Sequence, residues 1–128
     1  MTKKASTDGY KFTEALTVLK ALSDPIRLEI LGLLMHGDSC NCELTEKLRL
    51  PPNLLSYHLR LLRRAGLVNS RHDAMDARWI YYTVNRDAVI RWRAWFNEFF
   101  DPARIQERPV QCGPEGQRMV IDPSFVAI

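Results

Sequence analysis

The sequence lacks a long apolar run, a cleavable leader and a dense set of cysteines. No stretch approaches the roughly 18 apolar residues of a membrane-spanning helix, and the polar start Met1-Thr-Lys-Lys is not followed by the apolar segment of a signal peptide. We therefore expect a cytoplasmic protein with no membrane partner, whose three cysteines stay reduced. So few cysteines also exclude a secreted disulfide scaffold.

The sequence also lacks the usual signatures of an enzyme. It contains no glycine-rich phosphate loop, no convincing Ser/His/Asp arrangement and no paired carboxylates in a plausible cleft. A cysteine nucleophile needs an activating base, and the sequence identifies none. We expect a protein that is not an enzyme and that takes no organic cofactor.

Positive charge is concentrated in the middle of the chain. The 128 residues carry a net charge of +3, but residues 53–93 hold eight arginines against three aspartates, a net charge of +5. Residues 1–52 are neutral overall, and residues 94–128 carry a net charge of −2. A basic central block is typical of a nucleic-acid-binding surface, although a solvated charged face has the same composition.

Apolar periodicity divides the chain into helices and one hairpin. Helical spacing predicts helices at 12–22, 26–35, 53–65 and 86–100, and a short helix that Ser39 or Asn41 can cap and that ends at Leu48. The β-branched and aromatic segments 67–71 and 78–84 predict a hairpin with a mobile tip at 72–77. This order predicts a mainly α (α+β) winged helix-turn-helix with a β-hairpin wing. We expect a flexible arm at 1–9, a DNA-binding and dimerisation domain at 10–100, and an extended tail at 101–128.

Local signals fix the limits of the helices. Asp24 precedes Pro25 as an N-cap precedes a proline in the first turn, and Gly66 ends the fourth helix in the manner of a left-handed C-cap. The leucines at 55, 59 and 62 form the inward stripe of that helix.

The fourth helix and the hairpin carry the side chains expected to contact DNA. The first turns of the helix offer polar groups for base edges or phosphates, its outer face offers arginines for the backbone, and the wing adds further cations. These candidates are Asn53, Ser56, Tyr57, Arg60, Arg63, Arg64, Arg71, His72 and Arg78.

Two segments resemble the ArsR/SmtB family of bacterial winged-helix metalloregulators over about residues 10–100. The first is Asp24-Pro25-Ile26-Arg27-Leu28-Glu29-Ile30-Leu31, and the second runs from Ser56-Tyr57-His58-Leu59 to Gly66-Leu67-Val68. The resemblance implies a homodimeric repressor of operator DNA and adds His58 to the recognition motif. On spacing alone, His58 lies one position from the leucine stripe, which favours a partly buried histidine.

Cys40 and Cys42 lie in a segment similar to the thiol motif of the arsenic- and cadmium-sensing members. Residues two apart on a regular helix point to opposite sides, so the thiols converge only in an unwound first turn. A helix N-terminus stabilises thiolate, and chelation there would strain the helix-turn-helix and release DNA. The spacing alone also fits two cysteines that merely occupy a helix start.

Cys112 in the tail is the third candidate ligand, and three thiolates suit As(III) or Sb(III) as inducer. A site that adds His36 stays open. The chain departs from some arsenic sensors, since Thr45 stands where they have a third cysteine. The arm lacks the cysteine of cadmium and lead sensors, and the last helix lacks the histidine of zinc sensors. Sensing of Cd(II), Pb(II) or thiol oxidation through the same cysteines is the alternative.

Aromatic and aliphatic residues on the first and last helices exceed what a small core needs. The family resemblance implies that these helices pair in a homodimer, which would present two recognition helices to a palindromic site. The alternative is that these residues belong to the core. They are Phe12, Leu16 and Leu19 on the first helix and Val89, Trp92, Trp95, Phe96 and Phe99 on the last.

Overall fold

The structure is a computed structural model that describes residues 2–118, with side chains described over residues 12–114. The chain divides into two compact units, one ending at Arg93 and the other beginning at Ala94. Its elements are, in chain order, α1 (Thr2–Leu22), α2 (Pro25–Met35), β1 (Ser39–Cys40), α3 (Asn41–Leu48), α4 (Pro52–Arg64), β2 (Val68–His72), β3 (Ile80–Val84), α5 (Arg86–Phe99), a 3-10 turn (Pro102–Arg104) and α6 (Gly113–Arg118).

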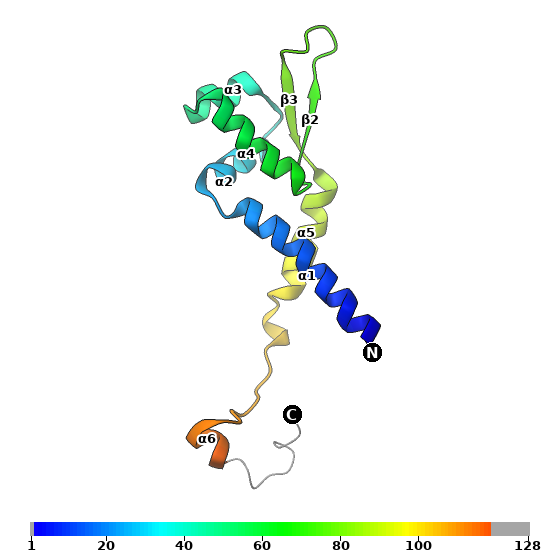
Figure 1. The fold of residues 1–128 in the computed structure, drawn as a ribbon, viewed down its shortest axis with the longest axis vertical. Helices are drawn as coiled ribbons and strands as arrows, with labels where there is room; N and C mark the ends of the chain where they lie inside the picture. Colours follow the sequence, from blue (N-terminus) through cyan, green and yellow to red (C-terminus); the bar gives the residue numbers. More distant parts are fainter. Residues whose placement is uncertain (1, 119–128) are drawn as a thin grey trace. The chain divides into compact units, whose positions relative to one another are not determined.

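The first unit confirms the mainly α winged helix-turn-helix fold. Helices α3 and α4 form the helix-turn-helix, and the hairpin of β2 and β3 projects from the helices as the wing (Figure 1). Of the helices described, none is long and apolar enough to cross a lipid bilayer.

The start of α2 confirms the capping signal. The Asp24 carboxylate accepts the main-chain N–H of Ile26 at 2.9 Å and that of Arg27 at 3.1 Å. Pro25 occupies the first turn, where its missing N–H costs no helical hydrogen bond. These bonds fix the direction in which α2 leaves the end of α1.

The chain reverses direction within a few residues between the end of α3 and the start of α4. Arg49 adopts a left-handed conformation at φ 53°, and the Thr45 carbonyl accepts the Leu50 N–H at 3.3 Å. The carbonyl of Pro51 then accepts the first N–H groups of α4, from Leu54 and Leu55, at 3.1 Å each.

The inward face of α4 is the centre of the core. The predicted stripe of Leu55, Leu59 and Leu62 is buried, and Leu62 is fully inaccessible. Ile30 of α2 and Leu44 of α3 are also fully buried, and α4 contacts both of these helices.

Gly66 ends α4 with φ 77°, which confirms the predicted left-handed cap. No atom lies within 4 Å of a Cβ built at Gly66, so Gly66→Ala is expected to cost about 1 kcal/mol of conformational strain and nothing from steric overlap. Gly32→Ala is the matched control, because Gly32 lies inside α2 with the same open space, and there alanine should stabilise. Urea unfolding measures both, and equal effects would contradict this reading of Gly66.

The sheet has the order β1-β3-β2, with both pairs antiparallel. In the wing, Val68 pairs with Val84 and His72 with Ile80, and Cys40 of β1 pairs with Tyr81 of β3. Strand β1 was not predicted, because two residues are too few to show an alternating pattern. It attaches the start of α3 directly to the wing.

Both ends of the chain differ from the expected arm and tail. Residues 2–9, expected as a flexible arm, continue α1, since lysine and alanine favour helix and extend the packed part of α1. The segment 101–118, expected without regular structure, contains the 3-10 turn and α6. The prediction for residues 119–128 lies outside the described residues.

Candidate nucleic-acid interface

The first turns of α4 present polar side chains on their outward face. Asn53, Ser56 and Tyr57 are all exposed, as is Leu54. The Asn53 side-chain oxygen accepts the Leu54 N–H at 3.1 Å, which leaves its two amide N–H groups available as donors. This face therefore offers donors, a hydroxyl and an aromatic ring to a DNA groove.

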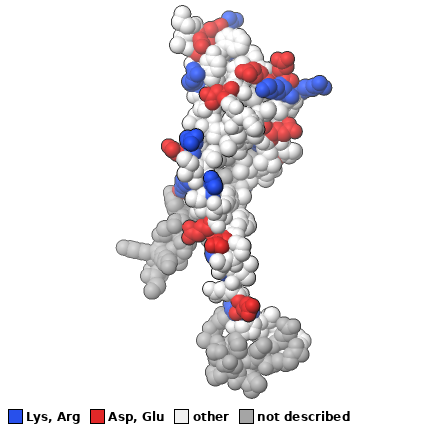
Figure 2. All heavy atoms as spheres, turned by 180° about the vertical axis from the view of Figure 1, so that it is seen from behind, with Lys and Arg blue, Asp and Glu red and all other residues white. Residues whose placement is uncertain are grey.

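The later turns of α4 carry arginines beside the base of the wing. Arg60, Arg63 and Arg64 line an open groove of about 600 Å³ together with Asn69 and Ser70 of β2. In the part of the chain that the structure describes, none of the three arginines forms an ion pair. Their charge is thus uncompensated, in contrast to a face on which acidic and basic residues are interspersed (Figure 2).

The cations of the wing differ in how they are held. The Arg71 guanidinium lies 4.5 Å from the centre of the Tyr81 ring, and His72 Nδ1 lies 2.8 Å from the Ala77 carbonyl oxygen. Arg78 forms an ion pair with Asp76 at 2.8 Å, and this carboxylate raises the pKa of Arg78. Of these two wing arginines, Arg78 is therefore paired with a carboxylate, whereas Arg71 lies over an aromatic ring.

Asp73 organises the tip of the wing. Its carboxylate accepts the N–H groups of Met75 at 2.9 Å and Asp76 at 3.0 Å and the hydroxyl of Tyr81 at 2.9 Å. The Met75 N–H, followed by the Tyr81 hydroxyl, lowers the pKa of Asp73. The tip is therefore a hydrogen-bonded turn that the sequence did not predict.

His58 points away from the outward face of α4. Its side chain is buried, with 5% of the residue exposed, and its Nδ1 lies 3.1 Å from an Arg27 nitrogen. The expectation that His58 contacts DNA, taken from the resemblance, therefore needs correction: the structure places it against the start of α2. The spacing beside the leucine stripe had indicated this position.

Cys40 is the N-cap of α3, and its thiol is buried. The Glu43 carboxylate accepts the Cys40 N–H at 3.2 Å, and this bond, followed by contact with the Cys40 thiol, lowers the pKa of Glu43. Cys42 is exposed one residue into the helix. Glu43 thus completes a capping box that the sequence analysis missed, although Glu three residues after an N-cap is its usual signal.

Cys112 is exposed and belongs to the second unit. Across the described residues, no three side chains of the types His, Cys, Asp and Glu are grouped so as to hold a metal ion. The three candidate thiols are chemically suited to a soft ion.

The apolar residues of the terminal helices divide into two groups. Phe12, Leu16 and Leu19 of α1 are exposed, whereas Trp92 of α5 is buried in the core. In the second unit, Trp95 stacks on Phe99 with centroids 5.0 Å apart, and Phe96 meets the Trp95 edge at the same distance. The exposed apolar group therefore lies on α1, whereas Trp92 belongs to the core.

Comparison with known proteins identifies the family. The family model described as "Bacterial regulatory protein, arsR family" matches residues 24–70. An HTH-type transcriptional regulator of Methanocaldococcus jannaschii is 36% identical over 80 residues, which span 62% of this chain and 86% of that protein. The chain belongs to the ArsR family. It is a DNA-binding transcriptional regulator and not an enzyme.

Two further relatives are also similar to this chain. Reduced HlyU from Vibrio cholerae superposes with a TM-score of 0.59 at 30% identity, covering 74% of this chain and 97% of HlyU. The arsenical resistance operon repressor of Staphylococcus xylosus is 45% identical over 62 residues, which span 48% of this chain and 60% of that repressor.

Arg60→Ala is expected to weaken binding to every DNA sequence by a similar factor. One lost phosphate contact reduces the slope of log affinity against log salt by about 1. Fluorescence anisotropy across a salt series measures the slope. Arg86→Ala, which removes an exposed arginine from the start of α5, is the control. An unchanged slope for Arg60→Ala would remove Arg60 from the phosphate contacts.

Proposed function

We propose that this regulator is a homodimeric repressor that binds operator DNA and releases it when As(III) or Sb(III) binds Cys40, Cys42 and Cys112. The observation that carries the proposal is the position of Cys40, which is both the N-cap of α3 and a member of β1. The relatives named arsenical resistance operon repressors in Staphylococcus xylosus and Staphylococcus aureus, 45% and 44% identical over 62 residues, support the choice of inducer.

The chemistry of the donors suits a metalloid. Thiolates are soft ligands, and the N-terminus of α3 favours their deprotonated form. Cys40 and Cys42 supply two thiolates from one turn of helix, and Cys112 is the remaining cysteine of the chain. A trivalent soft ion takes three such ligands without a fourth residue.

Binding to both Cys40 and Cys42 requires the start of α3 to change. One thiol is buried and the other exposed, as expected for residues about 200° apart around a helix. Bringing them to one ion turns the Cys40 side chain out of the core. This movement competes with the bond between the Cys40 N–H and Glu43 and with the pairing of Cys40 and Tyr81.

Two connections carry that change to the DNA-binding elements. Helix α3 packs against α4, the proposed recognition helix. A displaced first turn of α3 therefore disturbs the packing of α4. Tyr81, the residue of β3 that pairs with Cys40, donates a hydrogen bond from its hydroxyl to Asp73 at the wing tip. A change at Cys40 therefore affects both α4 and the wing, and release of DNA follows.

A homodimer completes the proposed repressor. The exposed apolar face of α1, formed by Phe12, Leu16 and Leu19, supplies a surface that a second copy would cover. A two-fold dimer presents two α4 helices to half-sites one helical turn apart. The proposed DNA contacts are Asn53, Ser56, Tyr57, Arg60, Arg63, Arg64, Arg71, His72 and Arg78, all outside the core.

The alternative inducer is an oxidant, or Cd(II) or Pb(II). The likeness to HlyU, whose structure is described as that of the reduced protein, supports thiol oxidation as the alternative signal. A disulfide between Cys40 and Cys42 would require the same rearrangement of α3, and so would give the same release.

Protection of thiols from alkylation tests the ligand set. Reduced protein is treated with N-ethylmaleimide with and without arsenite, and mass spectrometry of the peptides locates the label. The proposal predicts that arsenite protects Cys40, Cys42 and Cys112 together. Protection of the pair alone removes Cys112 from the set, and no protection contradicts As(III) as the inducer.

A further inference from the structure

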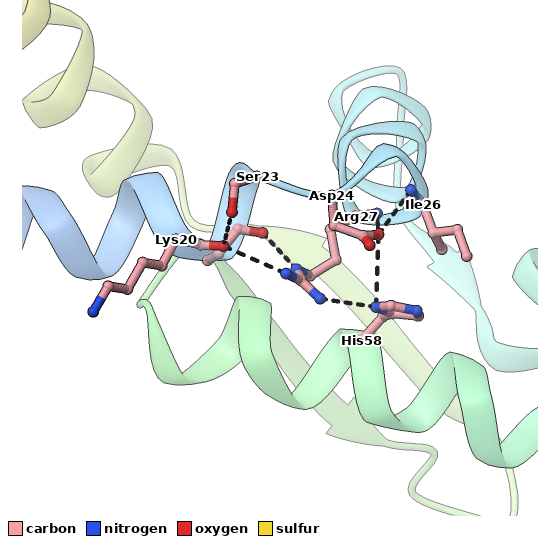
Figure 3. Close-up of polar contacts among 7 residues, drawn as sticks. Lys20, Ser23, Asp24, Ile26, Arg27 and His58 are labelled. Carbon is pink, nitrogen blue, oxygen red and sulfur yellow. Dashed lines mark hydrogen bonds and ion pairs between the residues drawn. The ribbon is translucent and has the colours of Figure 1, made fainter.

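A polar cluster beneath α4 ties three helices together at Arg27 (Figure 3). Arg27 Nε donates to the Ala21 carbonyl at 2.6 Å, and a second nitrogen donates to the Lys20 carbonyl at 3.4 Å. The third nitrogen lies 3.1 Å from Nδ1 of the buried His58. One guanidinium therefore joins the last turn of α1, the first turn of α2 and the middle of α4.

The contact with Arg27 fixes the protonation of the imidazole. A guanidinium has donors and no acceptor, so His58 Nδ1 accepts the hydrogen bond and carries no proton. The proton of the neutral ring is then on Nε2. In this form His58 is the contact through which Arg27 holds α4.

A carboxylate lies near the same ring nitrogen. Asp24 Oδ2 is 3.9 Å from His58 Nδ1. The Arg27 N–H, followed by the Ile26 N–H and the Arg27 charge, lowers the pKa of Asp24, so this group stays ionised near neutral pH. The ring thus contacts Arg27 of α2, lies near Asp24 at the N-cap of α2, and has the Tyr57 ring of its own helix beside it, with ring centroids 5.2 Å apart. The carbonyls of Lys20 and Ala21 in α1 accept hydrogen bonds from the Arg27 side chain.

We propose that Arg27 and His58 are positioning residues that hold α4 in its DNA-binding orientation only while His58 is neutral. A proton on Nδ1 removes the acceptor that Arg27 uses and leaves two positive groups in contact. The nearest acceptor for the new N–H is Asp24, which is reached only if the ring moves. Because Tyr57 directly precedes His58 on α4 and is exposed, this movement displaces the surface that meets DNA.

The expected result is a DNA affinity that falls as the pH is lowered. Histidine is the side chain whose unperturbed charge change falls between about pH 5 and pH 8. We expect the affinity of the form with a protonated His58 to be about tenfold lower than that of the neutral form, the effect of losing one hydrogen bond to a charged group. A cationic histidine that touched phosphate would give the opposite trend.

The test isolates His58 from the other two histidines of the chain. The reference protein carries His36→Asn and His72→Asn, and its affinity for operator DNA is measured by anisotropy against pH at fixed ionic strength. His58→Asn in this background places a neutral side-chain oxygen near the position of Nδ1, and is predicted to flatten the profile. His58→Leu, which offers no acceptor, should bind weakly at every pH.

The outcome separates positioning from simple packing. A His58→Asn profile that still falls like that of the reference would refute the proposal. If this variant does not fold, the ¹⁵N NMR spectrum of histidine-labelled wild-type protein decides instead. It must show an unprotonated His58 Nδ1 at about pH 8, and a protonated Nδ1 there would overturn the inference. No arsenite is present, so failure of the proposed inducer leaves this test unaffected.

Discussion

Serine at position 40 is expected to give a protein that still binds operator DNA and no longer releases it when arsenite is added. Serine is a good helix N-cap, so Cys40→Ser keeps the start of α3 and its bond to Glu43. It removes a thiolate that the inducer needs. Loss of a supporting residue around a metal site costs about 10–100-fold in affinity, so loss of a ligand itself should raise the effective arsenite concentration by at least about 100-fold.

Comparison of the three cysteine variants gives this prediction its control. Cys42→Ser changes an exposed residue and should show the same loss of response with no effect on folding. Cys112→Ser lies in the other unit and separates a two-thiol from a three-thiol site. The measurement is anisotropy of labelled operator DNA during arsenite titration. A Cys40→Ser protein that responds at wild-type concentrations would show that Cys40 is not a ligand.

Leu62→Ala is expected to cost about 3 kcal/mol of unfolding free energy, within the roughly 2–5 kcal/mol found for buried leucines. Leu62 is fully buried at the centre of the core, so truncation leaves a cavity under the recognition helix. The loss of packing should also weaken DNA binding, because α4 then no longer has one fixed position.

Urea unfolding at a fixed protein concentration measures this cost, since the stability of a dimer depends on concentration. Leu28→Ala is the matched control, because Leu28 is an exposed leucine on α2 and its truncation should change the stability by less than about 0.5 kcal/mol. A cost below about 1 kcal/mol for Leu62→Ala would contradict the assignment of this residue to a tightly packed core.

Local signals in the sequence predict most of the fold. Asp24 before Pro25, the leucines at 55, 59 and 62, and Gly66 after α4 each act within one or two helical turns, and each is confirmed. Strand β1 depends instead on pairing with Tyr81, which lies far along the sequence. Its two residues are not predictable without the tertiary structure.

The candidate site is less predictable than the fold, because its connections are between distant elements. The outward residues of α4 follow from helical spacing, and so does the position of Cys40 beside the start of a helix, whereas the capping box of Cys40 and Glu43 was not predicted. The bond of Tyr81 to Asp73 and the contact of Arg27 with His58 join segments that only folding brings together. For this reason the motif predicts a DNA contact for His58, whereas its contacts place it in the interior.

The measurement that tests the central claim most directly is fluorescence anisotropy of the reduced wild-type protein on DNA from upstream of its own gene, titrated with arsenite. The account predicts tight binding that collapses as arsenite is added and returns when a competing dithiol removes it. Binding that persists at arsenite concentrations saturating for the thiols would contradict the proposed inducer. It would direct the search to Cd(II), Pb(II) or oxidants acting on the same cysteines.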